Sequence, residues 1–346
     1  MPDSSSLKPQ FFQRIRQALT LHLPGIMVCL VIALAATFLS EHYGGPQLLY
    51  ALLIGLSFHF LMSNAQIKKG VDFCGRTVLR CGVALLGARI TLDQVSQLGL
   101  GTALVVALAL ACTIGFGILL AKWMGRSPAD GVLTGGSVAI CGASAAMAIS
   151  SVLPQTKDNE RFTLLVVVGV TVLSTIAMVV YPFSLQLLGF SPQTAGIVLG
   201  GTIHDVAQVV AAGMMLGSEA GDTATLVKLF RVMLLMPVVV VVVVAYRRHP
   251  AIQVAEQKVP LIPGFLMAFI VLVLLATAGV IQPPMAKLAG DVSRAFLVVA
   301  IAAAGIKTSF EDLVKLGWQP VIMLIGETLF IAAFVLVGVL VFGLGA

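Results

Sequence analysis

The sequence predicts an all-α polytopic membrane protein, and its composition and patterning carry that prediction. Hydrophobic residues make up 59% and charged residues 10% of the 346 residues, whereas roughly 25% of an ordinary globular protein is charged. The mean hydropathy is +1.04, and long apolar runs recur along the chain. So few charged side chains cannot cover a soluble protein of this size. The composition therefore excludes a cytosolic enzyme, a nucleic-acid-binding protein and a disordered chain.

About eleven transmembrane helices are predicted, because eleven segments approach the roughly 20 apolar residues that such a helix needs. The segments are 24–40, 47–63, 77–92, 98–121, 131–152, 162–187, 195–216, 225–246, 262–281, 295–310 and 317–342. Four of them are unusual: 77–92 holds two arginines, 131–152 and 195–216 are interrupted by glycines, and 225–246 opens with two basic residues. Polar groups inside a bilayer are costly, so function is expected in these four.

The orientation follows from the Lys and Arg residues of the loops. With the N-terminus inside, twelve fall in cytoplasmic segments and four in external loops. We therefore expect a cytoplasmic N-terminal segment, 1–23, and a single transmembrane domain, 24–346. Eleven crossings place the C-terminus outside, and one crossing more or fewer reverses that side.

Two segments resemble each other at a shift of 218 residues: 82–99 (GVALLGARITLDQVSQLG) and 300–317 (AIAAAGIKTSFEDLVKLG). They lie seven predicted crossings apart, so the two copies run in opposite directions. This order indicates the inverted-repeat fold of secondary transporters, with chance similarity of small-residue helices as the alternative. In the repeat the two basic residues, Arg89 and Lys307, are expected to form ion pairs at helix ends. The aligned pairs are Gly87 with Gly305, Arg89 with Lys307, Asp93 with Glu311, Leu98 with Leu316 and Gly99 with Gly317.

Two of the unusual segments, 131–152 and 195–216, are predicted to be interrupted helices. Each contains a Gly-Gly pair followed by Ser or Thr. Glycine tolerates unwound backbone, and the N-terminal ends of broken helices attract anions. Tight helix packing is the alternative role for such small residues, and their Gly-x-x-x-Gly spacing also permits a homo-oligomer. The predicted helix breaks are Gly135, Gly136, Gly200 and Gly201, and the first segment offers Ser137, Cys141, Gly142 and Ser144 to a substrate.

The most distinctive cluster of polar residues in the sequence is His204, Asp205 and Gln208. Asp205 is the only charged residue between 162 and 218, and an ionisable residue at membrane depth is a functional hypothesis by default. Histidine titrates near neutral pH, so His204 and Asp205 are candidates for binding or relaying a coupling ion. The alternative is a helix end at the membrane surface. Gln208 shares a helical face with His204 and is expected to orient a substrate.

Two cations, Lys228 and Arg231, lie three residues apart at the start of an otherwise charge-free apolar run. Pointing inward, they offer positive charge to an anionic substrate. Pointing outward, they reach the lipid headgroups. We expect the inward arrangement, because two anchoring cations on one helical face are costly.

No signature of an enzyme is present. The chain contains no Walker loop, no G-x-S-x-G elbow and no H-E-x-x-H or other zinc spacing, so neither an enzyme nor a metal site nor a cofactor is predicted. The five cysteines form no C-x-x-C pair and are interpreted as buried thiols.

Three motifs together resemble the YeiH family of bacterial inner-membrane proteins, which are catalogued as sulfate exporters: SVAICGASA (137–145), HDVAQVVAAG (204–213) and KLFRVMLLMP (228–237). The resemblance spans about 24–342 and implies an inner-membrane location. It also implies a fold related to cation/proton antiporters and bile-acid symporters, in which a core domain with two interrupted crossing helices faces a scaffold domain.

The first hypothesis is therefore a secondary transporter of a small anion, sulfate or an organosulfonate, with possible proton coupling. The alternative is a sodium- or proton-coupled organic-anion carrier of the same fold. An anion channel or a membrane sensor is a third class, which the scarcity of pore-lining polar residues disfavours.

Overall fold

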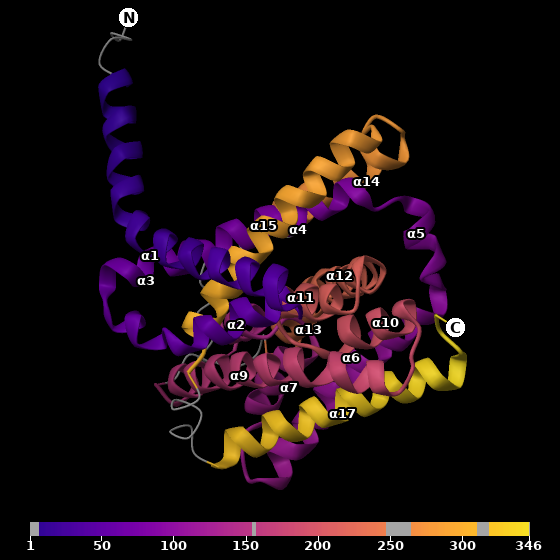
Figure 1. The fold of residues 1–346 in the computed structure, drawn as a ribbon. Helices are drawn as coiled ribbons and strands as arrows, with labels where there is room; N and C mark the ends of the chain where they lie inside the picture. The colour runs from indigo at the N-terminus through magenta and orange to yellow at the C-terminus, as the bar shows by residue number, and fades with distance from the viewer. Residues whose placement is uncertain (1–6, 154–156, 247–263, 310–317, 346) are drawn as a thin grey trace, which may run out of the picture. The chain divides into compact units, whose positions relative to one another are not determined.

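A computed structural model describes residues 7–153, 157–246, 264–309 and 318–345, and every regular element in these ranges is a helix (Figure 1). The predicted all-helical class is confirmed. Backbone polar groups inside a bilayer must be satisfied within the protein, and a helix does this within one segment.

Within these ranges, six stretches are long and apolar enough to cross a membrane. Their mean hydropathies range from 1.6 to 2.6. The helices are α1 (Leu7–Tyr43, spanning from Leu21), α6 (Gly99–Trp123), α9 (Lys157–Leu187, spanning from Arg161), α12 with α13 (Ser218–Met233 and Leu235–Tyr246), α15 (Pro283–Lys307) and α17 (Trp318–Phe342).

The other predicted spans are built from shorter helices. Three apolar helices of 10–17 residues are α2 (Gln47–Ser57), α11 (Val206–Met215) and α14 (Gly264–Thr277). The segment 77–92 is divided between α4 (Leu79–Leu86) and the short helix η3 (Gly87–Arg89). A total of eleven crossings therefore depends on these short helices and stays a prediction.

The contacts divide the chain into two compact units, where the sequence predicts one domain from 24 to 346. Unit 1 contains residues 1–83 and 291–307. In it α1 packs on α3 (Ala65–Phe73), where Gly25 and Gly70 allow the two backbones to touch. The side chain of Asn64 caps α3 by accepting the backbone N–H of Gln66 at 2.9 Å. The remaining short helices of this part are η1 (His59–Ser63) and η2 (Cys74–Val78).

Unit 2 contains residues 84–290 and 308–346 and holds every predicted substrate and coupling residue. It begins with η3 and α5 (Leu92–Gln97), and its centre is formed by α6, α7 (Pro128–Ala139), α9, α10 (Pro192–Thr202), α12 and α17. The tightest packing joins α6 to α7 and α10 to α12, and both contacts run through glycines.

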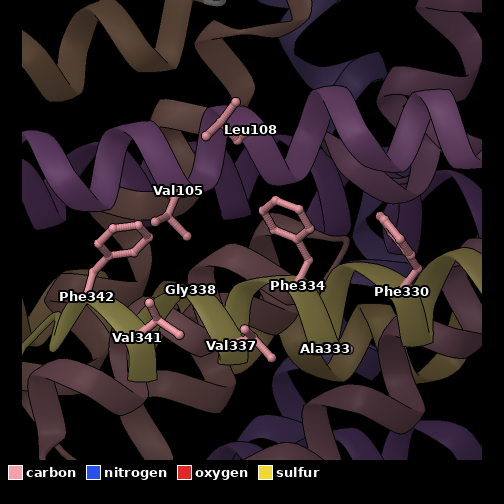
Figure 2. A pocket seen from close by; sticks show the side chains of 9 residues that line it. All are labelled: Val105, Leu108, Phe330, Ala333, Phe334, Val337, Gly338, Val341 and Phe342. Carbon is pink, nitrogen blue, oxygen red and sulfur yellow. The ribbon is translucent and has the colours of Figure 1, made fainter.

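An apolar groove of about 400 Å³ runs between α6 and α17. Figure 2 shows Phe342 of α17 beside Val105 of α6, with Phe334 and Phe330 further along α17, and all nine lining residues are apolar. It offers no polar group to an ion, so the groove is not the predicted anion site.

The two basic residues of the predicted repeat do form ion pairs. Arg89 ends η3 and lies 4.0 Å from the Asp222 carboxylate within unit 2. Lys307 ends α15 and lies 2.8 Å from Asp72 within unit 1. Both basic residues thus form ion pairs at helix ends as expected, but their partners are Asp222 and Asp72 and not the acidic residues four positions further on. Glu311 lies outside the described residues, and the inverted repeat itself stays a prediction.

Candidate functional site

The predicted segment 131–152 is two short helices, α7 and α8 (Ala143–Ser150), separated at Ile140–Gly142. Ser127 caps α7 by accepting the Asp130 N–H, and Pro128 occupies the first turn, where its missing N–H is not needed. Gly142 has φ +63° and ψ −128°, a conformation that only glycine adopts readily. The chain therefore breaks at the one residue that can turn it into α8.

The segment 195–216 is broken in the same way, into α10 and α11, with the interruption at Ile203–Asp205. Ser191 caps α10 by accepting the Thr194 N–H, and Pro192 follows it. The two interruptions lie next to each other: a Cβ added to Gly142 would lie 3.5 Å from the Cβ of His204. The sequence prediction of two interrupted helices is confirmed, and the two breaks form one site.

The position of the breaks differs from the prediction. Gly135 and Gly136 lie inside α7, and Gly200 and Gly201 lie inside α10, so the helices end several residues later. These glycines serve close packing instead. A Cβ on Gly200 would lie 2.5 Å from the Ala224 carbonyl oxygen, and one on Gly135 would lie 2.9 Å from that of Thr113.

Lys228 and Arg231 of α12 are fully buried and point into the two breaks. The Lys228 ammonium donates to the carbonyl oxygens of Ile140, at 2.6 Å, and Ile203, at 2.9 Å. One cation thus joins the end of α7 to the end of α10.

Arg231 binds further carbonyls of the same two helix ends. Its Nε donates to Ala139, one terminal nitrogen donates to Val138, and the other donates to Gly200 and Ile203, at distances of 2.8–3.1 Å. The last carbonyls of a helix lack partners within the helix and carry partial negative charge. The two cations therefore satisfy the C-terminal ends of α7 and α10 directly.

His204 connects this site to α17. Its Nδ1 lies 3.2 Å from the Val138 carbonyl oxygen and its Nε2 lies 3.0 Å from the Thr328 hydroxyl. A carbonyl oxygen can only accept, so Nδ1 carries a proton. The Thr328 hydroxyl also lies 2.6 Å from the Leu324 carbonyl oxygen, so its one proton serves either that carbonyl or Nε2. The ring is only 1% exposed and fixes the break in α10–α11 between α7 and α17.

Asp205 and Gln208 begin the second half of the broken helix. The Asp205 carboxylate accepts the Ala207 N–H at 2.8 Å and so caps α11. The Gln208 amide nitrogen donates to the Thr175 hydroxyl of α9 at 2.7 Å, while its buried carbonyl oxygen has no partner among the described residues. That oxygen is a free acceptor inside the site.

The candidate ligands of the first segment differ in accessibility. The Ser137 hydroxyl donates to the Leu133 carbonyl within α7, and Cys141 is 5% exposed in the break itself. Ser144, in the first turn of α8, is exposed. Gly142 has no side chain to cap α8, and the Cys141 sulfur interacts with the Ala145 N–H, so an external acceptor would bind the remaining N–H groups of this first turn.

The electrostatic balance at the breaks is positive. Each helix end carries about half a charge, negative at α7 and α10 and positive at α8 and α11. These partial charges cancel, so Lys228 and Arg231, when both are protonated, leave about one net positive charge beside the Asp205 carboxylate. Such a site favours an anion.

Comparison with known proteins places the chain in a family. The family model described as conserved hypothetical protein 698 matches residues 24–324. A UPF0324 membrane protein of Chlorobaculum tepidum is 48% identical over 91% of this chain and 88% of its own length. The chain belongs to the YeiH (UPF0324) family.

Other relatives of this YeiH protein cover nearly its whole length. The UPF0324 membrane protein TauZ of Paracoccus denitrificans is 48% identical over 92% of this chain and 95% of its own length. One from Rhizobium meliloti is 45% identical over 96% of both chains. No solved structure matches the YeiH chain.

Several site residues of this YeiH protein were not predicted from sequence. Ser174 accepts the Asp205 N–H at 3.0 Å, Thr175 binds Gln208, and Thr328 binds His204. Ser174 and Thr175 are a hydroxyl pair in the apolar part of α9, and Thr328 follows Glu327 in α17. Hydroxyl side chains of this kind are common in packed membrane helices. Only their contacts with the broken helices distinguish them from hydroxyl residues that merely pack one helix against another.

Proposed function

We propose that this protein is a secondary transporter of a small anion, sulfate or an organosulfonate, across the bacterial inner membrane. The observation that carries the proposal is the pair of adjacent helix breaks with a net positive charge held by Lys228 and Arg231. Interrupted helices at a buried polar site are the usual construction of a transporter binding site.

The cations attract the anion mainly through their electric field, since most of their N–H groups already bind backbone carbonyls. Direct hydrogen bonds then come from the open N-terminal turn of α8 and from the exposed Ser144 hydroxyl. The name TauZ, which two Paracoccus relatives carry, supports a sulfonate such as taurine as one substrate to test.

A sodium- or proton-coupled carrier of organic anions is the second candidate. The observation that favours it is the unpartnered oxygen of Gln208, close in sequence to the Asp205 carboxylate. Oxygen atoms of this kind are what a hard cation such as sodium requires.

The test is exchange of labelled sulfate and labelled taurine in proteoliposomes loaded with the same unlabelled anion. Added pH or sodium gradients identify the coupling ion. We expect exchange of at least one anion above protein-free liposomes, and its loss in His204→Ala but not in the exposed control His42→Ala. Failure of both anions to exchange and to raise the thermal stability of the protein would overturn the assignment, whereas a dependence on sodium would favour the second candidate.

A further inference from the structure

Glu327 is the only acidic residue of α17, and it is fully buried. Its side chain reaches the contact between α6 and α7, where Gly117 leaves room for it. A Cβ added to Gly117 would lie 2.6 Å from the Glu327 Oε1 atom. The carboxyl group is therefore enclosed by three helices of unit 2.

One hydroxyl group binds this carboxyl. Thr134 Oγ lies 2.6 Å from Oε1, while Oε2 is buried without a partner among the described residues. Thr134 Oγ also lies 3.1 Å from the Asp130 carbonyl oxygen of its own helix. A hydroxyl has one proton to donate, so it can serve the carboxyl or the carbonyl, not both.

The protonated carboxyl fits this arrangement better than the carboxylate. As an acid, Glu327 donates to Thr134, and Thr134 donates to Asp130, which completes a chain of hydrogen bonds. As a carboxylate, it leaves a charged oxygen unpaired in an apolar interior, which is far more costly than an unpaired neutral carbonyl.

No cation compensates a negative charge on Glu327 within the described part of the chain, where none of the salt bridges includes it. The helices packed against α17 are α6, α7, α9 and α10. Asp130 of α7 is paired with Arg126, α10 has no titratable side chain, and Lys122 of α6 and Arg161 of α9 are exposed. The remaining titratable groups with described side chains on these helices are Cys112 and Tyr181, and His204 reaches α17 through Thr328.

Two other ionisable groups of the site, His204 and Asp205, are held in one state by their partners. A second proton on His204 would add positive charge beside Arg231, because both bind the Val138 carbonyl. Asp205 is held as a carboxylate by the N-terminal end of α11 that it caps. Among the acidic side chains that the structure describes at this site, Glu327 has neither a salt bridge nor a helix N-terminus beside it, so its protonation state can change with solvent access.

We propose that Glu327 is the proton-binding site of this carrier, which rests on the transport function proposed above. In the conformation described here the carboxyl holds its proton. When the site opens to water, the O–H bond breaks, the proton passes to a water molecule and a carboxylate remains. Uptake of a proton from water on the other side restores the acid. The link to the anion runs along α17, where the next residue, Thr328, binds His204.

The test compares wild type with Glu327→Gln, an amide of the same shape that cannot release a proton. Two assays are made in proteoliposomes with labelled sulfate and labelled taurine. The first measures anion exchange without a pH gradient, and the second measures anion accumulation driven by a pH gradient. Glu327→Gln should exchange within about twofold of wild type and lose the response to the gradient. Glu41→Gln, an exposed acid-to-amide change, is the control and should keep both activities.

Accumulation by Glu327→Gln that still follows the pH gradient would overturn the proposal. Loss of exchange together with loss of gradient response would also overturn it, provided that Glu327→Asp, which keeps a carboxyl, fails in the same way. Recovery of both activities in Glu327→Asp would support it.

Infrared spectroscopy of the purified protein separates this proposal from the transport function. Wild type should show the carbonyl band of a protonated carboxyl that Glu327→Gln lacks. If neither anion moves but the band is present, the function is wrong and the proton site remains. If the two spectra do not differ in this band, the proton site is wrong whatever the protein transports.

Discussion

Lys228 and Arg231 act at the scale of single residues by holding the backbone. Together they bind the carbonyls of Val138, Ala139 and Ile140 on one side and of Gly200 and Ile203 on the other. Without them, two helix ends with the same partial charge would meet in the protein interior, and most of their last carbonyls would lack a donor. The cations make the close approach of the two breaks possible.

Replacing Arg231 by Met should therefore cost about 3–5 kcal/mol of stability, because it removes four hydrogen bonds from a buried site and leaves the Ala139 and Gly200 carbonyls without a side-chain donor. Lys228→Met should cost less, since Lys228 serves two carbonyls. Thermal unfolding of the purified protein measures both, with Arg161→Met, at an exposed arginine, as the control. An Arg231→Met protein with wild-type stability and no anion affinity would show instead that Arg231 is mainly an anion ligand.

Polar residues of the site could be predicted from sequence where they stand out in an apolar run, as His204, Asp205 and Lys228 do. The role of Glu327 could not, although it stands out equally. Its partner Thr134 lies 193 residues away, and only the fold brings the two together. The direct partners of Arg231 are backbone carbonyls, which no side-chain pattern reveals.

At the scale of elements, glycine has two separate roles in this protein. Gly142 provides a backbone conformation with φ +63°, whereas Gly117, Gly131 and Gly135 let α6 and α7 touch. The sequence predicted two interrupted helices correctly and assigned the breaks to the wrong glycines. A Gly-Gly pair has the same appearance in a break and in a tight contact, so only the partner helix decides between them.

Gly142→Ala should lower stability by about 1–3 kcal/mol through backbone strain, because alanine does not adopt this conformation readily. The space around the new Cβ is ordinary, at 3.5 Å from the His204 Cβ. A wild-type thermal unfolding profile in Gly142→Ala would mean that the break does not need this conformation.

Gly117→Ala should also destabilise the protein by about 1–3 kcal/mol, for a different reason. Its Cβ would lie 2.6 Å from the Gly131 carbonyl oxygen and from Glu327 Oε1, which forces α6 and α7 apart. Gly115→Ala, two residues earlier in α6, has nothing within 4 Å and is the matched control. Equal unfolding temperatures for the two variants would contradict a glycine-mediated contact between α6 and α7.

At the scale of the whole molecule, six stretches are long enough to cross the bilayer, and the broken pairs and short helices make up the remaining predicted crossings. Hydropathy could predict that the chain is a membrane protein and where its apolar segments lie. It could not distinguish a continuous span from two half-helices, because both bury the same apolar residues. The division into two compact units depends on long-range contacts and was not predicted.

An odd number of crossings places the two ends of the chain on opposite sides of the membrane. Alkaline phosphatase fused after residue 346 should be active, because that end of the chain would lie in the periplasm. A fluorescent protein fused at the same place should not fluoresce. A fluorescent protein fused in the basic loop at 124–127 should fluoresce in the cytoplasm. Fluorescence from the C-terminal fusion would give an even number of crossings and would exclude eleven.

The central claim is that the anion binds where the two helix breaks meet, and labelling of Ser144→Cys tests it most directly. The substituted thiol is made in a protein without its native cysteines and reacted with a water-soluble maleimide in proteoliposomes. Sulfate or taurine, whichever the protein exchanges, should slow labelling at residue 144, which lies in the open first turn of α8, and leave Ser184→Cys on α9 unchanged. Full exchange of the anion with unaltered labelling at residue 144 would contradict the claim and place the site elsewhere.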